Sequence, residues 1–459
     1  MSGVSRVTPL SESDASFIYL EQPGEPWSIQ QEVHLTGRLE PERLLSAARA
    51  ACERHPLARA RLAPFRARDR VYKWEIQDQV SLPALEVLDY ADERDLARIR
   101  DRFLSEHPSL SVAPPFKLLL LRGPGGDVLL FNFHHAAYDG LSVFRILTSM
   151  FRSYAGIEHD PVPDFDPLDA RELRPLIVPD KLRERLARLR RLPALLAEGN
   201  RPSVSVAPRM EVQEQGRQGI GFCLLSFDEH EIARIKAHRR GASTMNDVML
   251  GALVLAVRRW NAKHHADTGM ISVMVPVNVR PKAWAAEVLG NFASYIPVAV
   301  TQTVPDNLDD LIAAVTQRTQ WSKRHHTASA MFDLLTMFLR LLPVGLKERW
   351  KSRVPQTRVE LQDTAIFSNL GRLDLPDLGS DAGAVRSAWI SPPVRFTRGF
   401  GIGVIFLPDS MHISLRYHRA LFDEASASAF AQLYRETLLQ EGPGRSYSST
   451  TSVSPSLTA

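Results

Sequence analysis

One continuous stretch, residues 128–140, constrains this chain more than any other. It begins with a run of Val, Leu and Phe that follows a cluster of turn-forming residues at 123–127, and this pattern predicts a buried strand. From Ser142 to Tyr154 apolar residues recur at helical spacing, which predicts a helix. The residues between them therefore lie at a strand-to-helix junction, where polar side chains can face a cavity while the backbone stays fixed.

The junction carries two adjacent histidines, three spacers and an Asp-Gly pair. Asp139 beside the flexible Gly140 suits the start of a helix, because a short carboxylate can accept the free N–H groups there. We expect His134 to pack or hydrogen-bond structurally, and we take His135 as the candidate for chemistry. Two other histidine pairs do not follow a buried strand and serve as an internal control: 264–265 and 325–326.

Length and composition exclude several classes of protein. A chain of 459 residues is too long for one ordinary core, so we expect two domains of about two hundred residues each. The net charge of +4 is small and the basic residues are dispersed, which argues against nucleic-acid binding. Cys52 and Cys223 are far apart, and no histidine or cysteine cluster has ligand spacing, so neither a disulfide framework nor a metal is expected.

Targeting signals are not evident in the sequence. The N-terminus has no basic segment followed by an apolar run. The best apolar stretch, Val248 to Val257, is about half the length that a membrane span requires. Cytoplasmic residence is therefore the default expectation.

Both halves of the chain alternate helices with strands, as α/β sandwiches do. In the first half we predict helices at 8–20, 41–55 and 92–106, and strands at 28–37, 70–77, 83–88, 116–122 and 127–133. In the second half we predict helices after Asp228 and at 244–261, 308–323 and 423–438, and strands at 219–227, 270–277, 293–300, 363–369, 399–406 and 411–418.

Some segments between these elements allow two interpretations. A basic amphipathic helix at 181–198 is typical of contact with an anionic membrane surface, but also of a solvated connector packed along one stripe. An apolar helical hairpin at 329–350 is typical of a lipid contact, and equally of a lid or core helix. Residues 199–217 are polar and turn-rich and mark the domain boundary, and the Ser/Thr-rich tail at 441–459 is predicted to be disordered.

The motif HHxxxDG at 134–140 resembles the signature of the CoA-dependent acyltransferase superfamily. That superfamily includes chloramphenicol acetyltransferase, the condensation domains of peptide synthetases and the bacterial wax ester synthase/diacylglycerol acyltransferases, and the chain most resembles this last group. The resemblance covers about residues 8–435 and follows landmarks that occur in the same order: 9–17, Asn246-Asp247, 276–281, Gly290-Asn291 and Phe367-Ser368-Asn369.

This resemblance implies a fold of two chloramphenicol-acetyltransferase-like α/β sandwich lobes that form a V-shaped pseudo-dimer with a tunnel between them. We accordingly place a first lobe with HHxxxDG at 1–176, a basic helix and linker crossover at 177–217 and a second lobe at 218–440. The thioester and the acceptor are expected to enter the tunnel from opposite sides.

The resemblance also implies roles for individual residues. His135 faces the tunnel as general base, and His134 and Gly140 are structural. Asp139 pairs with a buried arginine, for which Arg280 is the candidate, although a helix-capping carboxylate with no distant partner is the alternative. Four further residues are candidates for lining the tunnel or stabilising an oxyanion, each being equally interpretable as a turn or capping residue: Asn246, Asn291, Ser368 and Asn369.

A neutral histidine suits acyl transfer, because its pKa lies near working pH. No G-x-S-x-G elbow is present, so a serine hydrolase is not favoured. We therefore expect direct transfer of an acyl group from an acyl-CoA or acyl-carrier-protein thioester to an alcohol, of the wax ester synthase/diacylglycerol O-acyltransferase type, with no bound cofactor.

Two alternatives stay open. The group usually carries Pro-Leu-Trp before the histidine motif, whereas this chain has Pro114-Pro115-Phe116, which leaves the acceptor undecided. The first alternative is a stand-alone condensation enzyme that joins a carrier-bound acyl or polyketide chain to an amine or alcohol, with an acyl-carrier protein as partner. The second is a non-catalytic, acyltransferase-like binding module. Peripheral contact with the inner membrane face is a further candidate interaction.

Overall fold

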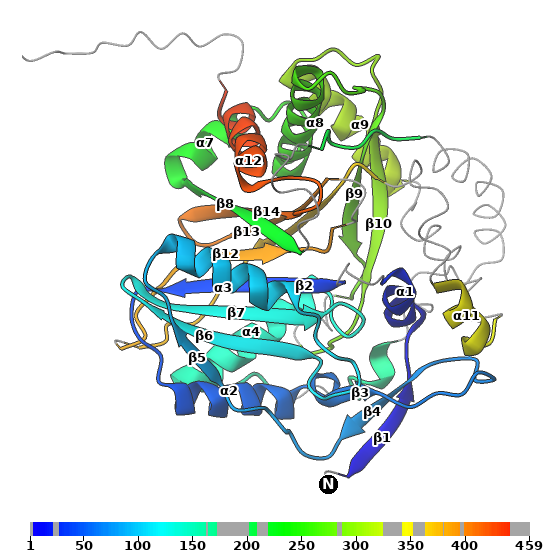
Figure 1. Cartoon of the computed structure of the whole chain (residues 1–459), viewed down its shortest axis with the longest axis vertical. Helices are drawn as coiled ribbons and strands as arrows, with labels where there is room; N and C mark the ends of the chain where they lie inside the picture. The colour runs from blue at the N-terminus through cyan, green and yellow to red at the C-terminus, as the bar shows by residue number, and fades with distance from the viewer. Residues whose placement is uncertain are drawn as a thin grey trace, which may run out of the picture.

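The computed structural model describes residues 3–21, 27–161, 164–171, 202–208, 219–281, 287–324, 342–351, 363–379, 381–394 and 399–440. Two large sheets lie one above the other in Figure 1, and each carries its own set of helices. The site discussed below lies where the two sheets meet.

The lower sheet in Figure 1 has the order β12-β2-β7-β6-β5, in which all neighbours are antiparallel except β5 and β6. Its strands are β12 (Val385–Ser391), β2 (Ser28–Leu35), β7 (Gly126–His134), β6 (Phe116–Gly123) and β5 (Glu86–Asp89). Three helices pack on it: α2 (Pro41–Arg54), α3 (Glu93–Ser105) and α4 (Gly140–Ala155).

Strand β7 is buried on both faces, which explains its nearly unbroken apolar sequence. Successive side chains of a strand point to opposite faces. Leu129, Phe131 and Phe133 accordingly belong to the core that contains α2 and α4, whereas Val128 and Leu130 belong to the core that contains α3. Packing on both faces therefore fixes the strand up to His134, and this also fixes the position of the histidine pair at its end.

A small sheet at the bottom of Figure 1 supports the first helix of the chain. It has the order β1-β4-β3, formed by Val4–Pro9, Lys73–Gln77 and Ala60–Leu62, with a short 3-10 helix at Pro56–Arg59. Helix α1 (Glu12–Leu20) begins with a capping box, in which the side chains of Ser11 and Asp14 each accept the other's backbone N–H. This cap sets the direction in which α1 leaves the small sheet.

The upper sheet has the order β10-β9-β11-β13-β14-β8. Its strands are β8 (Ile220–Asp228), β9 (Ile271–Asn278), β10 (Ala293–Val300), β11 (Ala365–Arg372), β13 (Phe400–Phe406) and β14 (Ser410–His418). Its core includes α7 (Glu229–Ala237), α8 (Met245–Lys263), α9 (Leu308–Arg324) and α12 (Glu424–Leu439). Helix α8 is almost entirely buried, as its apolar sequence predicts.

One strand crosses between the halves of the chain. Strand β12, which the sequence did not lead us to expect, belongs to the second half but pairs with β2 at the edge of the first lobe's sheet. Most residues of the core around β7 come from the first half of the chain and most of the core around α8 from the second, while residues 385–391 join the first lobe's sheet from the second half.

Several segments singled out in the sequence lie outside the described residues. They are most of the basic helix and linker at 177–217, most of the apolar hairpin at 329–350, and the tail at 441–459. The described end of the hairpin is a short helix, α11 (Val344–Lys351).

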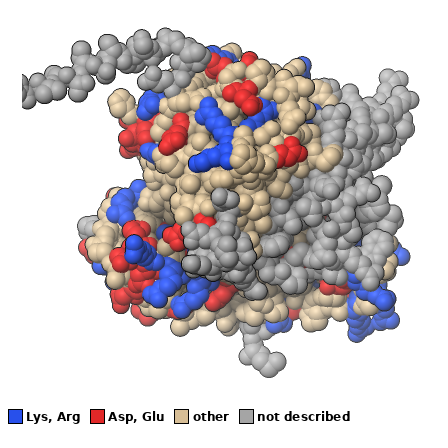
Figure 2. All heavy atoms as spheres, turned by 45° about the horizontal axis from the view of Figure 1, so that its top comes forward, with Lys and Arg blue, Asp and Glu red and all other residues tan. Residues whose placement is uncertain are grey.

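The surface shows mixed charge. On the face drawn in Figure 2, basic and acidic side chains lie interspersed among neutral ones. Among the residues that the structure describes, none of the helices has the length and hydropathy needed to cross a membrane.

Gly403 provides a test of how closely β12 and β13 approach. A Cβ atom at this position would lie 1.8 Å from the backbone oxygen of Ile390 in β12. Gly403→Ala should therefore force the two strands apart and lower the free energy of unfolding by about 1–3 kcal/mol, measured by urea denaturation. Gly125→Ala is the control, because its neighbour is the movable end of the Arg386 side chain. Equal midpoints for the two variants would contradict the close approach.

Candidate active site

A cavity of about 390 Å³ lies between the two lobes. The first lobe contributes α1, β2 and the start of α4, and the second contributes β9, β10 and β11. Most of the lining side chains are apolar, and they include Phe17, Leu20, Trp27, Ile29, Met274, Ile366, Leu370 and Ile390. A cavity of this size and character suits a small or medium-sized apolar ligand.

His135 lines this cavity, whereas its neighbour His134 is 2% exposed and does not. The two side chains differ because β7 ends at His134 and the chain then turns toward α4. The His135 backbone N–H donates to the carbonyl of Trp27 at 2.9 Å, which anchors the turn to the start of β2. The structure therefore places the second histidine of the pair, and not the first, at the cavity wall.

The His135 ring is held on two sides. Phe17 of α1 stacks on it, with ring centroids 3.8 Å apart and an interplanar angle of 17°. Its Nδ1 lies 3.2 Å from Oδ1 of Asn291, a residue that is itself 2% exposed. These contacts restrict both the tilt and the rotation of the imidazole.

The environment of the ring keeps it neutral. Burial lowers the pKa of His135 from 6.5 to about 4. Hydrogen bonding to its own backbone carbonyl and to Asn291, together with the charge of Asp139, acts in the opposite direction, and the charge of Arg416 adds to the lowering. A neutral imidazole at physiological pH is the form that can accept a proton.

Asp139 is the N-cap of α4, where its Oδ1 accepts the N–H of Ser142 at 2.8 Å. It also pairs with Arg280, whose Nη2 lies 3.0 Å and 3.1 Å from the two carboxylate oxygens. Both residues are buried, and the Ser142 hydroxyl and the Phe292 N–H also donate to the carboxylate, at 2.8 Å and 2.9 Å. Burial acts to raise the pKa of Asp139, but the Arg280 charge and the N–H donors outweigh it and hold this pKa below its usual range.

The structure thus places Asp139 and Arg280 together and makes Asp139 the cap of α4 as well. Of the four remaining candidates for lining the tunnel or binding an oxyanion, two line the cavity and two do not. Ser368 and Asn369 line the cavity. Asn246 is not a lining residue, and its Oδ1 accepts a hydrogen bond from Asn369 at 3.4 Å. Asn291 is not a lining residue either, because its side chain is enclosed beside His135.

Comparisons with other proteins give the family. The profile of the condensation-domain family matches residues 9–168. An uncharacterised protein of Mycobacterium tuberculosis is 33% identical over 414 residues, which cover 90% of this chain and 94% of that protein. The chain belongs to the condensation-domain family. The family is one of transferases of acyl groups, so the coarse class expected from the histidine motif agrees with it.

Solved structures match the fold along nearly the whole chain. The starter condensation domain of rhizomide synthetase has a TM-score of 0.64 at 17% identity and covers 95% of this chain and 94% of that one. The cyclization-docking bidomain of a synthetase from Sorangium cellulosum has a TM-score of 0.65 at 14% identity, covering 94% of this chain and 84% of that one. The expected two-lobe, chloramphenicol-acetyltransferase-like architecture is confirmed.

Three residues of this condensation-domain protein matter to the site although the sequence did not mark them individually. Phe17 and Trp27 lie against the His135 ring, and Asp14 accepts a hydrogen bond from Asn291 Nδ2 at 3.1 Å. The Ser-x-x-Asp pattern at the start of α1 was a usable signal for Asp14. No comparable local pattern marks the two aromatic residues, because only the folded chain brings them to the histidine.

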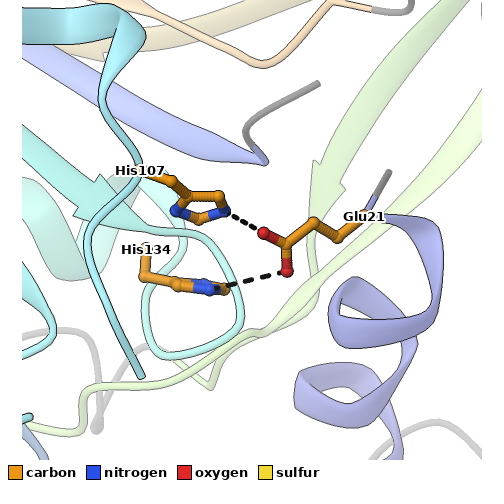
Figure 3. A group of neighbouring side chains, drawn as sticks. All are labelled: Glu21, His107 and His134. Carbon is orange, nitrogen blue, oxygen red and sulfur yellow. Dashed lines mark ion pairs between the residues drawn. The ribbon is translucent and has the colours of Figure 1, made fainter. Parts of the chain in front are cut away.

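His134 belongs to a separate cluster with Glu21 and His107, in which the centroids of the two imidazole rings lie 4.3 Å apart and the Glu21 carboxylate faces both of them (Figure 3). Their donor atoms lie within 4.8 Å of one another, as in some metal sites. However, His134 Nδ1 accepts the backbone N–H of Ala136 at 3.1 Å, so the neutral ring carries its proton on Nε2, which faces Glu21. A metal would need that lone pair, so the cluster suits a carboxylate that balances two imidazoles better than a metal ligand set.

The ion pair between Asp139 and Arg280 generates a stability prediction. Arg280→Met leaves a buried carboxylate without its countercharge, which should cost about 3–5 kcal/mol of unfolding free energy. Asp139→Asn combined with Arg280→Met removes both charges and should recover part of that loss. Chemical denaturation of the two variants and the wild type measures this. A cost of less than about 1 kcal/mol for Arg280→Met, the value typical of exposed pairs, would contradict it.

Proposed function

We propose that this protein transfers an acyl group from a thioester, carried by coenzyme A or by an acyl-carrier protein, to an alcohol or amine bound in the interlobe cavity. His135 acts as the general base. The observation that carries the proposal is the placement of a neutral, restrained imidazole at the wall of an apolar cavity between the two lobes. Membership of the condensation-domain family supports it.

The transfer needs one base and no covalent intermediate on the protein. The imidazole removes the proton of the acceptor O–H or N–H as that heteroatom attacks the thioester carbonyl carbon. The tetrahedral intermediate then collapses, the C–S bond breaks, and the imidazolium returns the proton to the leaving thiolate. An ester or amide and a free thiol are formed, and His135 is neutral again. Ser368 and Asn369, which line the cavity, are the candidate donors to the oxyanion.

The apolar lining favours substrates with hydrocarbon character over strongly polar ones. His135 has to remove one proton from the acceptor, whether this is a long-chain alcohol, as in wax ester synthesis, or an amine, as in peptide condensation. The two acceptors differ only in what surrounds the heteroatom. The structure of the rhizomide synthetase domain contains C8-CoA and Leu-SNAC, which makes medium-chain acyl thioesters sensible first donors. The alternative function is that of a binding module without turnover, and activity measurements distinguish such a module from an enzyme.

A panel experiment tests the proposal. The purified protein is incubated with acyl-CoA and acyl-carrier-protein donors of several chain lengths and with alcohol and amine acceptors, and products are identified by mass spectrometry. His135→Ala should abolish product formation while leaving the thermal melting profile close to that of the wild type. His230→Ala, at an exposed position on α7, is the matched control and should retain full activity. Unchanged turnover by the His135→Ala protein would exclude the mechanism.

The lowered pKa of His135 makes a separate prediction about pH. The neutral ring is the competent form, and protonation occurs only as the pH falls through a pKa of about 4 instead of 6.5. Among the charged neighbours, Asp139 raises this pKa and Arg416 lowers it. The value of kcat/KM should therefore stay level from about pH 8 to about pH 5.5. Circular dichroism at each pH controls for acid unfolding, and a decline centred near pH 6.5 in folded protein would contradict the assignment.

A further inference from the structure

Asn291 lies next to the His135 ring but does not line the cavity. We propose that Asn291 is a positioning residue that keeps the imidazole proton of His135 on Nδ1 and thereby leaves Nε2 with the lone pair that accepts the substrate's proton. This inference rests on the proposed role of His135 as general base. It replaces the expected role of Asn291 in lining a tunnel or binding an oxyanion.

The orientation of the Asn291 amide follows from its partners. Its Nδ2 donates to the backbone carbonyls of His135 and Ala136, at 2.8 Å and 3.1 Å, and to Oδ1 of Asp14 at 3.1 Å. All three partners are oxygen acceptors. A flipped amide would set Oδ1 against these oxygens in a buried site, which is strongly unfavourable. The oxygen of the amide is therefore the atom that faces His135.

This orientation decides which ring nitrogen carries the proton. Asn291 Oδ1 can only accept, and it lies 3.2 Å from His135 Nδ1. A lone pair on Nδ1 would place two acceptors opposite each other, whereas an N–H there makes a hydrogen bond. The backbone carbonyl of His135 also interacts with the ring, and Asn291 Nδ2 holds that same carbonyl in place. Asn291 therefore favours the Nδ1–H form in two ways. Its Oδ1 accepts the proton directly, and its Nδ2 holds the backbone carbonyl that also interacts with the ring.

Asn291 is itself held by residues from distant parts of the chain. Asp14, which is fully buried on α1, accepts from Asn291 Nδ2 and also from Trp74 Nε1 at 3.3 Å. Arg171 forms an ion pair with the same carboxylate and balances its charge. The amide is therefore fixed by a network that reaches α1, β4 and the short helix at Asp169–Arg171. A side chain held in this way can impose a proton position without moving.

A pair of substitutions separates the proposed role from simple support of the backbone. Asn291→Leu and Asn291→Asp both remove the amide N–H groups that hold the carbonyls of His135 and Ala136. Asn291→Asp also sets a carboxyl oxygen against these carbonyls and against Asp14, so its structural loss is at least as large as that of Asn291→Leu, and thermal melting of both variants is recorded. Only Asn291→Asp keeps an acceptor for the Nδ1 proton. Asn132→Leu is the matched control, because Asn132 is also buried and its Nδ2 donates to the backbone carbonyl of Glu106 at 2.6 Å without contacting His135.

The proton position is read directly by NMR of protein labelled with ¹⁵N-histidine, in which protonated and unprotonated ring nitrogens have well separated shifts. The His135 signals are assigned by their loss in His135→Ala. The wild type, Asn291→Asp and Asn132→Leu should show Nδ1 protonated and Nε2 bare. Asn291→Leu should show a mixture or a shift toward the Nε2–H form. An unchanged Nδ1–H tautomer in Asn291→Leu would overturn the inference, because the backbone carbonyl alone would then suffice.

Kinetics give the second measurement. Asn291→Leu should lower kcat by at least about tenfold with a smaller change in KM, because the base is present but its proton is misplaced. Asn291→Asp should retain more activity, and its acid limb should move to higher pH, because a carboxylate beside Nδ1 stabilises the imidazolium. The other charges near the ring are those of Asp14, Asp139 and Arg416, and none is altered. Equal activity losses and identical pH profiles in both variants would contradict the inference.

The outcomes also separate this inference from the proposed function. Full activity in His135→Ala would remove the general base and the need for a positioned tautomer together. Loss of activity in His135→Ala with normal tautomer and activity in Asn291→Leu would leave the base in place and remove only the role of Asn291. The tautomer measurement requires no substrate, so it is informative even before the true donor and acceptor are identified.

Discussion

The buried ion pair between Asp139 and Arg280 is the constraint on which the rest of the site depends. Arg280 lies just beyond β9 of the second lobe, and Asp139 caps the first helix after the histidine motif in the first lobe. Neither charge is stable in a dry interior without the other. The pair therefore holds the start of the β9–β10 connection against the start of α4. Gly290, whose carbonyl accepts the N–H of Asp139 at 3.3 Å, lies in that connection.

The position of Asn291 follows from this arrangement, because Asn291 comes directly after Gly290 in the sequence. Once the ion pair and the Gly290 contact have set the backbone, the Asn291 amide meets the carbonyls of His135 and Ala136 on one side and Asp14 on the other. The site thus has two distinct halves. A dense polar network behind the His135 ring sets its orientation, while the apolar cavity in front keeps it neutral. Neither half alone would give a directed base.

Local sequence patterns predicted most of the helices and strands, including the strand-to-helix junction that carries the site. The apolar run before His134, the Asp-Gly pair and the helical spacing after it were enough to place a capped helix at Asp139, and the family landmarks were enough to select Arg280. The position of β12 was not predictable in this way, since pairing with a strand as distant in sequence as β2, where Val385 lies opposite Leu35, leaves no local signal. The positioning role that we propose for Asn291 had no local signal either, because Gly-Asn is an ordinary turn sequence until its neighbours are known.

The His135 network also bears on how one fold serves different acceptors. A pKa of about 4 makes the free imidazole a weak base, so groups that stabilise the imidazolium as it forms matter to the transfer. During transfer the imidazolium keeps its Nδ1–H bond to Asn291, and the carboxylate of Asp139 lies near enough to favour its charge. Asn291 lies outside the cavity lining, and the Asp139 carboxylate is already bonded to Arg280 and to backbone N–H groups, so an alcohol and an amine meet the same base. Selection between them must then come from the cavity wall, where α1, β9, β11 and β12 contribute mostly apolar side chains from both lobes.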